Sequence, residues 1–187
     1  IGGIYGLRRS EILGLRWQDI DFETGTLQIR HKVAEVRING KRQLVRSNDL
    51  KTEASRRAFP LSDDIRQRLE RRKAQIEENR AKKRRYRTAD ADYVFVDANG
   101  KLLSPEYVSD HFRWRIAHSD LPKIRFHDLR HTCATLLLHE GCSLREIQSY
   151  LGHASYLTTT RYAHIDARSK EHALEIMSAV LNVDKDN

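Results

Sequence analysis

Residues 26–46 read TLQIRHKVAEVRINGKRQLVR, and this stretch decides the fold class. Apolar and polar residues alternate over Thr26–His31 and again over Val33–Ile38, which is the pattern of half-buried strands. The dipeptide Asn39-Gly40 that follows is a strong local signal for a tight hairpin turn. We therefore expect an antiparallel hairpin whose return strand covers Gln43–Arg46.

The rest of the chain predicts one more sheet strand, an isolated short strand and several helices. A third extended segment, Ser55–Leu61, is expected to complete one small antiparallel sheet, and Tyr93–Val96 is expected to form a separate short strand. Capping residues and apolar residues at helical spacing predict the helices. These cover Ser10–Leu15 (extending back toward Ile4), Ser62–Ala81, Ser104–His118, His127–His139, Ser143–Leu151, Ser155–Ala163 and Ala167–Leu181. The fold class is therefore α+β, a mostly α-helical domain over residues 1–187 with a small antiparallel β-sheet.

Composition places the chain among soluble globular proteins. Of its 187 residues, 39% are hydrophobic and 32% are charged, and no apolar run is long enough to cross a bilayer. We therefore expect a cytoplasmic protein with no membrane partner. Cys133 and Cys142 lack metal-type spacing, which favours reduced thiols in a reducing compartment. The chain begins in a helical pattern without Met, so we expect a fragment of a longer protein.

The positive charge of the chain favours a polyanionic partner. The formal net charge is +8 and the pI is near 9.7, which indicates nucleic acid or an anionic membrane surface. Residues 66–87 hold eleven Lys or Arg against three Glu. Charge alone does not separate a DNA contact there from a solvated helix followed by a basic loop.

Four separated motifs carry residues with chemical potential. They are Gly6–Leu15, Lys51-Thr52, His127–Thr132, and Leu151–His153 with Tyr162 nine residues further on. Taken singly, each has an ordinary structural explanation, such as a surface ion pair, a helix cap or a core aromatic residue. The combination points instead to phosphoryl transfer without a metal ion.

Positively charged donors are needed because negative charge grows on the phosphate oxygens during attack. An arginine presents a planar fork that binds two oxygens and keeps its proton, so two arginines can clamp one phosphate. His127 and Arg130 are three residues apart and project from the same face of a helix. Both can therefore reach a single phosphate.

A tyrosine suits the role of nucleophile in such a reaction. Phenoxide leaves more readily than a serine alkoxide, so the ester stores the bond energy for rejoining. The free phenol has a pKa near 10, so cationic neighbours or a base must help it lose its proton. The carboxylates show no two-metal spacing, which argues against an ordinary nuclease, and we expect neither a metal nor a cofactor.

The motifs, in this order and spacing, resemble the tyrosine recombinase (phage integrase) family over essentially the whole chain. The resemblance implies that Arg8, directly after Gly6-Leu7, is the first catalytic arginine and that Glu11 supports it. Lys51 matches the hairpin lysine that protonates the leaving 5′ oxygen. Lys32 and Lys41 lie nearby as alternatives, and Lys51 is the preferred assignment.

The second half of the motif set carries over in the same way. The resemblance implies that His127 assists proton transfer and that Arg130 holds the scissile phosphate. His153 matches the histidine that donates a hydrogen bond to the phosphate. Tyr162 matches the nucleophile that forms a 3′-phosphotyrosyl bond. Tyr150 and Tyr156 do not fit the family interval from the histidine.

The resemblance also implies double-stranded DNA as the partner and a tetramer as the assembly on two duplexes. Backbone contacts would come from the basic stretch, through Arg66, Arg72, Lys73, Lys82, Lys83, Arg84 and Arg85. We expect the N-terminal DNA-binding domain that is usual in the family to lie outside this sequence. The C-terminal helix and tail, residues 166–187, pack either on their own domain or on a neighbouring protomer.

Two other functions compete with recombination. A type IB topoisomerase uses similar arginine, lysine, histidine and tyrosine chemistry as a monomer, and a DNA-binding regulator keeps the fold without catalysis. The Leu151–His153 motif and the compact length favour the recombinase over the topoisomerase, and the complete residue set argues against the regulator. Our preferred role is integration and excision of a phage or conjugative mobile element in the bacterial cytoplasm, at the nucleoid.

Overall fold

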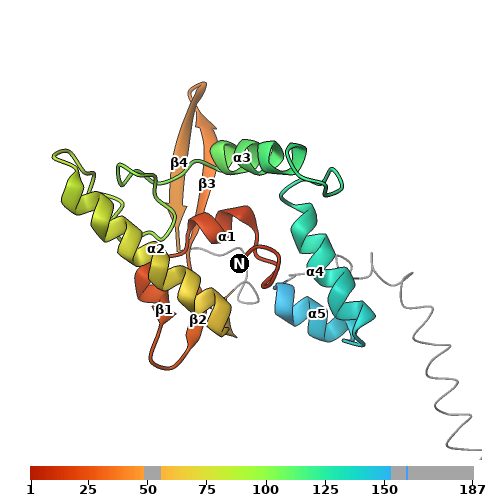
Figure 1. The fold of residues 1–187 in the computed structure, drawn as a ribbon. Coiled ribbons are helices and arrows are strands. Elements are labelled where there is room, and N and C mark those ends of the chain that lie inside the picture. Colours follow the sequence, from red (N-terminus) through yellow and green to blue (C-terminus); the bar gives the residue numbers. More distant parts are fainter. Residues whose placement is uncertain (49–55, 153–158, 160–187) are drawn as a thin grey trace, which may run out of the picture.

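The computed structural model describes residues 1–48, 56–152 and 159 (Figure 1). The predicted helices Ser155–Ala163 and Ala167–Leu181 fall outside these residues, as does most of the predicted C-terminal region. The elements are α1 (Arg9–Leu13), η1 (Trp17–Asp19), β1 (Ile20–Asp21), β2 (Thr26–Ile29), β3 (Lys32–Ile38), β4 (Lys41–Ser47), β5 (Arg57–Pro60), α2 (Asp63–Lys82), α3 (Pro105–Ala117), α4 (Asp128–His139) and α5 (Leu144–Leu151). The α+β class is confirmed.

The strands form two sheets, so the prediction of a single sheet was wrong. Strand β2 pairs with β1 on one edge and with β5 on the other, both antiparallel. Both edges of β2 are therefore occupied, and β3 pairs only with β4. The β3–β4 hairpin instead packs on α1, where a Cβ added at Gly14 would lie 2.5 Å from the backbone oxygen of His31.

The hairpin turn is confirmed at the predicted residues. Asn39 and Gly40 both have positive φ angles, 50° and 76°, which suits a type I′ turn. Ile38 pairs with Lys41 directly across the turn, and the paired return strand runs from Lys41 to Ser47. The ladder is thus longer than the Gln43–Arg46 segment that alternation alone predicts.

The predicted strand Tyr93–Val96 is a buried connection rather than a strand. It makes only isolated bridges, Arg16 to Tyr93 and Val96 to Leu102. The Val94 N–H donates to the Leu15 oxygen at 3.0 Å. Because the segment bonds to different partners in turn, no ladder forms among the described residues, although Tyr93, Val94 and Val96 are buried as in a core strand.

The first helix begins at Arg9, so the predicted extension back toward Ile4 was wrong. Gly6 has a φ of +58°, and Arg8 is extended with ψ 148°. A left-handed residue followed by an extended one cannot continue a helix. Glu11 closes the N-terminus by accepting the backbone N–H of Arg8 at 2.8 Å.

The predicted starts of α2, α3 and α5 agree with the structure to within a residue. The Ser104 hydroxyl accepts the Tyr107 N–H at 3.1 Å at the start of α3. Ser143 and Glu146 form a reciprocal capping box at the start of α5. Gly152 ends α5 in the left-handed conformation, with φ 66°. No helix in the described part of the chain is long and apolar enough to span a membrane.

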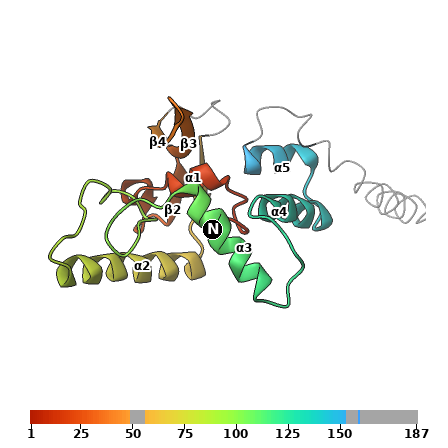
Figure 2. The same cartoon turned by 90° about the horizontal axis from the view of Figure 1, so that it is seen from above.

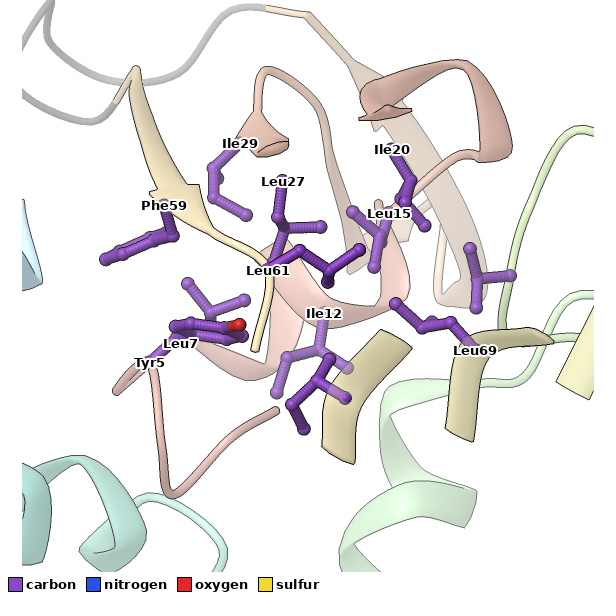
Figure 3. Close-up of a cluster of buried hydrophobic side chains, with 12 residues drawn as sticks. Tyr5, Leu7, Ile12, Leu15, Ile20, Leu27, Ile29, Phe59, Leu61 and Leu69 are labelled. Atoms are coloured by element: carbon purple, nitrogen blue, oxygen red, sulfur yellow. The ribbon is translucent and has the colours of Figure 1, made fainter. Parts of the chain in front are cut away.

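The main core lies between the β1–β2–β5 sheet, α1 and α2 (Figure 3). Leu27 and Phe59 reach into it from the sheet, Ile12 from α1 and Leu69 from α2. Helix α2 covers one side of this layer, and the β3–β4 hairpin stands on the other (Figure 2). Helices α4 and α5 pack on each other around a smaller cluster that includes Cys133 and Ile147.

Candidate active site

Arg8 stands at the N-terminus of α1 and is held on two sides. Its Nη1 donates to Glu11 Oε1 at 2.7 Å, and its Nη2 donates to the Gly152 backbone oxygen at 3.1 Å. The side chain is 37% exposed. The guanidinium is therefore fixed in direction while part of it still faces solvent.

The carboxylate of Glu11 is buried and shared between two arginines. Arg57 Nη2 donates to Glu11 Oε2 at 2.9 Å from strand β5. Burial alone would raise the pKa of Glu11, but the Arg57 and Arg8 groups bring that pKa below its usual range. Glu11 is therefore a permanent anion near neutral pH, as a support for Arg8 requires.

Arg57 is a site residue that the sequence motifs missed. It shares a face of β5 with Phe59, which lies in the core, so strand alternation places the Arg57 side chain toward the interior. A cation buried there requires an acidic partner. That reasoning from the pattern would have predicted an ion pair for Arg57.

Arg130 joins the first motif to the last one from the middle of the molecule. Its side chain lies in the buried start of α4, and the residue is only 4% exposed. Nη1 donates to the Gly6 oxygen and Nη2 to the Leu151 oxygen, each at 2.6 Å. One guanidinium fork thus holds the loop before α1 against the end of α5, and both views show this end of α5 beside that loop (Figures 1 and 2).

Gly6→Ala is expected to destabilise the protein more than an alanine substitution at a glycine where only the positive φ angle opposes the change. A Cβ at Gly6 would lie 2.3 Å from Leu151 Cδ2, and φ is +58°. Gly141→Ala is the matched control, because Gly141 has φ +87° and a Cβ added there would meet no atom of the described residues within 4 Å. We expect Gly141→Ala to cost about 1 kcal/mol and Gly6→Ala about 1–3 kcal/mol more. Urea unfolding of both variants measures this, and equal losses would contradict the close approach.

His127 sits at the N-terminus of α4, one turn before Arg130. Its ring packs edge-on against His131, with ring centroids 5.0 Å apart. Partial burial, the nearby His131 and the Arg130 charge lower the pKa of His127 below its usual value. A neutral imidazole is therefore favoured at neutral pH, and such a ring can accept a proton.

Arg8 and His127 both line the same cleft, which has a volume of about 630 Å³. Its walls come from the start of α1, strand β3, helix α3 and the loop before α4. Among its described lining residues there are four arginines, Arg8, Arg9, Arg113 and Arg125, and one carboxylate, Glu35. A hollow with this balance of charge suits an anionic ligand such as a phosphodiester.

Arg125 is partly neutralised by an acid at the start of α4. It contacts Asp128 at 2.9 Å, and its hydrogen bonds lower the pKa of Asp128 to about 2. Asp128 therefore stays ionised and holds Arg125 at the rim. No three His, Cys, Asp or Glu side chains within the described ranges lie close enough together to bind a metal ion.

Comparison with known proteins identifies the family. The statistical model of the phage integrase family matches residues 4–169. This chain belongs to the phage integrase family. The match includes all the motifs from Gly6 to Tyr162.

Individual tyrosine recombinases are similar to this phage integrase chain. It is 32% identical over 185 residues to tyrosine recombinase XerA of Pyrococcus furiosus, covering 95% of this chain and 52% of the relative. It is 28% identical over 180 residues to a tyrosine recombinase XerC-like protein of Caldanaerobacter subterraneus subsp. tengcongensis, covering 92% and 46%. The chain thus spans about half the length of the curated relatives it matches.

Solved structures show that the fold is shared. The Tn1549 transposon integrase in complex with transposon right end DNA superposes with a TM-score of 0.69 at 23% identity, covering 93% of this chain and 56% of the other. The crystal structure of XerA recombinase gives a TM-score of 0.61 at 24% identity, covering 95% and 54%. The helices and small antiparallel sheets of this integrase family member therefore form a known arrangement.

Three of the predicted catalytic residues, Lys51, His153 and Tyr162, lie outside the described residues. The structure does show why Tyr150 is a poor nucleophile in this integrase family chain. Its hydroxyl donates to the Ile4 oxygen at 3.1 Å, and burial raises its pKa. A phenol that is engaged in this way and hard to ionise is poorly suited to act as a nucleophile.

The predicted DNA-contacting stretch divides into two groups in the structure. Arg66 donates to the Phe22 oxygen, and Arg72 donates to the Val94 oxygen at 3.2 Å. Both guanidinium groups thus tie α2 to the sheet side of the molecule and have a structural role. Contacts to DNA remain a prediction for all seven residues. Lys73, Lys82, Arg84 and Arg85 are exposed, whereas Lys83 is half-buried and donates to Asn99 Oδ1 at 2.7 Å.

Proposed function

We propose that this chain carries the cutting and rejoining centre of a site-specific DNA recombinase, with Tyr162 as nucleophile. One observation carries the proposal: the Arg130 fork and Arg8 together hold Gly6, Leu151 and Gly152 in one place. Gly152 directly precedes His153 in the sequence. Three motifs therefore converge at the arginines, although the hydrogen bonds that join them span 144, 124 and 21 residues of chain.

In the proposed reaction the Tyr162 oxygen bonds to phosphorus while the bond from phosphorus to the 5′ oxygen breaks. The phenolic proton passes to neutral His127, and Lys51 gives a proton to the departing 5′ oxygen. Arg8 and Arg130, with a hydrogen bond from His153, stabilise the charge on the non-bridging oxygens. The same steps in reverse rejoin a strand, so the chemistry uses no cofactor.

The arginines of the cleft supply the proposed DNA surface next to the reacting phosphate. Arg9, Arg113 and Arg125 would contact backbone phosphates, with the exposed lysines and arginines after α2 adding weaker contacts. The fold is similar to that of a transposon integrase whose structure was solved in complex with DNA, which supports double-stranded DNA as the partner. We further propose assembly as a tetramer on two duplexes, acting at the bacterial nucleoid to integrate and excise a mobile element.

The test is covalent trapping on nicked DNA in the presence of EDTA. Because the target sequence is unknown, the probe is a pool of nicked duplexes with random sequence, from which a short strand diffuses away after cutting. We expect SDS-resistant complexes that form without divalent metal and are enriched for one sequence. A requirement for divalent metal, or no trapped DNA at all, would contradict the proposal. Relaxation of supercoiled plasmid without sequence preference would favour the topoisomerase alternative.

A further inference from the structure

We propose that Arg57 is a positioning residue, which orients Arg8 through the carboxylate that the two arginines share. This inference rests on the proposed function of Arg8 in strand cutting. Arg57 lies in strand β5 and contacts Glu11 in the core of the molecule. Arg57 does not line the cleft that Arg8 and His127 share.

The geometry ties both oxygens of Glu11 to both arginines. Oε1 lies 2.7 Å from Arg8 Nη1 and 3.4 Å from Arg57 Nη1. Oε2 lies 2.8 Å from the Arg8 backbone nitrogen and 2.9 Å from Arg57 Nη2. A carboxylate with a fork on one side and a helix start on the other has little freedom to rotate. Arg8 takes its direction from that carboxylate.

Two of the three side chains are buried, and only the one at the cleft is partly exposed. The side chains of Arg57 and Glu11 are 8% and 3% exposed, while that of Arg8 is 37% exposed. The Arg57 guanidinium also stacks over the Phe59 ring at 5.5 Å, which anchors it to β5. The three charged groups sum to +1, and the exposed member of the set is Arg8. Arg57 therefore acts from inside the protein on the group that faces the phosphate.

The first test needs no catalysis. In the free protein, the ¹⁵N relaxation of the Arg8 Nε–H group reports how firmly the guanidinium is held. Arg57→Met keeps an unbranched side chain that reaches as far as Nε and removes the charged guanidinium, and it is expected to increase the mobility of Arg8. Arg56→Met removes the same charge from the adjacent exposed residue and is expected to leave Arg8 unchanged. An Arg8 signal that is the same in Arg57→Met and wild type would overturn the inference.

The second test is a mutant cycle on strand cutting. Arg57→Met is expected to leave the DNA affinity within about twofold of the wild-type value. It is expected to lower the single-turnover cutting rate by about 100-fold. In a Glu11→Gln background the same change is expected to add less than about twofold, since the shared carboxylate is gone. If Arg57→Met lowers the cutting rate by the same factor with and without Glu11→Gln, Arg57 acts by another route. That result would overturn the inference.

Arg57→Lys covers the case in which Arg57→Met fails to fold. Lysine keeps the positive charge beside Glu11 but lacks the planar fork, so we expect an intermediate loss of about tenfold with a folded protein. Wild-type cutting with Arg57→Lys would contradict the need for a fork. If the wild-type protein forms no adduct, the proposed function fails, and the relaxation of Arg8 still decides the inference.

Discussion

Tyr162→Phe is expected to lose covalent attachment to DNA completely while retaining its affinity for the duplex. The substitution removes one hydroxyl, and without it the proposed reaction has no atom to bond to phosphorus. Loss of an essential nucleophile lowers a rate by on the order of 10⁴-fold or more, which places trapping below detection. SDS gels of the nicked-duplex reaction measure the adduct, and a filter-binding titration measures the affinity.

The matched control for this substitution is Tyr150→Phe. The Tyr150 hydroxyl donates to the Ile4 oxygen, and its ring packs on Phe59, so the variant loses one hydrogen bond and keeps its packing. We expect a stability loss of about 1 kcal/mol with trapping intact. Adduct that persists in Tyr162→Phe and disappears in Tyr150→Phe would reverse the assignment.

Arg130→Ala is expected to abolish cutting and also to destabilise the protein, because the guanidinium has a structural task at the centre of the site. In the wild-type protein the Arg130 Nη1 and Nη2 groups lie 2.6 Å from the Gly6 and Leu151 oxygens. The substitution leaves both oxygens without these donors. Each buried acceptor that loses its partner costs about 1–3 kcal/mol. Cutting should fall by at least about 100-fold, since the loop before Arg8 is no longer held.

Two comparisons separate the roles of Arg130. Arg130→Lys keeps the charge but cannot bridge two carbonyl oxygens with a planar fork, so we expect partial recovery of stability and little recovery of cutting. Arg113→Ala removes an exposed arginine of the cleft and should weaken DNA binding without a measurable change in unfolding. Urea unfolding that leaves Arg130→Ala as stable as Arg113→Ala would show that the two hydrogen bonds contribute nothing.

Local sequence signals predicted the parts of the fold that depend on neighbouring residues. Asn39-Gly40 fixed the hairpin because both residues tolerate positive φ, and Ser104 and Ser143 marked helix starts because their hydroxyls cap the first turn. The sheet arrangement depends on which strand occupies each edge of β2. Alternation in β3 indicates a strand. It does not indicate whether the edge of β2 beside which β3 would pair is already occupied by another strand.

In the candidate site, too, contacts between residues close in sequence were easier to predict than contacts between distant segments. The family resemblance implied that Glu11 supports Arg8, and the two side chains do form an ion pair at 2.7 Å. The hydrogen bonds from Arg130 to Gly6 and Leu151 cross 124 and 21 residues of chain, and no periodicity encodes such a contact. Alternation in β5 indicates that Arg57 needs an acidic partner, but it does not indicate that the partner is Glu11, 46 residues earlier in the chain.

Charge density was a weaker guide than motif spacing. The stretch from 66 to 87 has a strong surplus of positive charge, yet Arg66 and Arg72 direct their guanidinium groups to backbone oxygens of their own protein. Composition gives the number of charges on a helix but not the direction of each side chain. The arginines of the cleft come instead from three separate segments, and no window of the sequence brings them together.

The most direct test of the proposed mechanism is to determine which side chain carries the covalent bond to DNA. Trypsin cutting after Arg161 and Arg168 releases the peptide YAHIDAR, residues 162–168, apart from the peptide that contains Tyr150 and Tyr156. Tandem mass spectrometry of the trapped complex, after nuclease trimming, should find the nucleotide on the phenol of Tyr162. A nucleotide attached to any other side chain would contradict the convergence of the four motifs on one phosphorus atom.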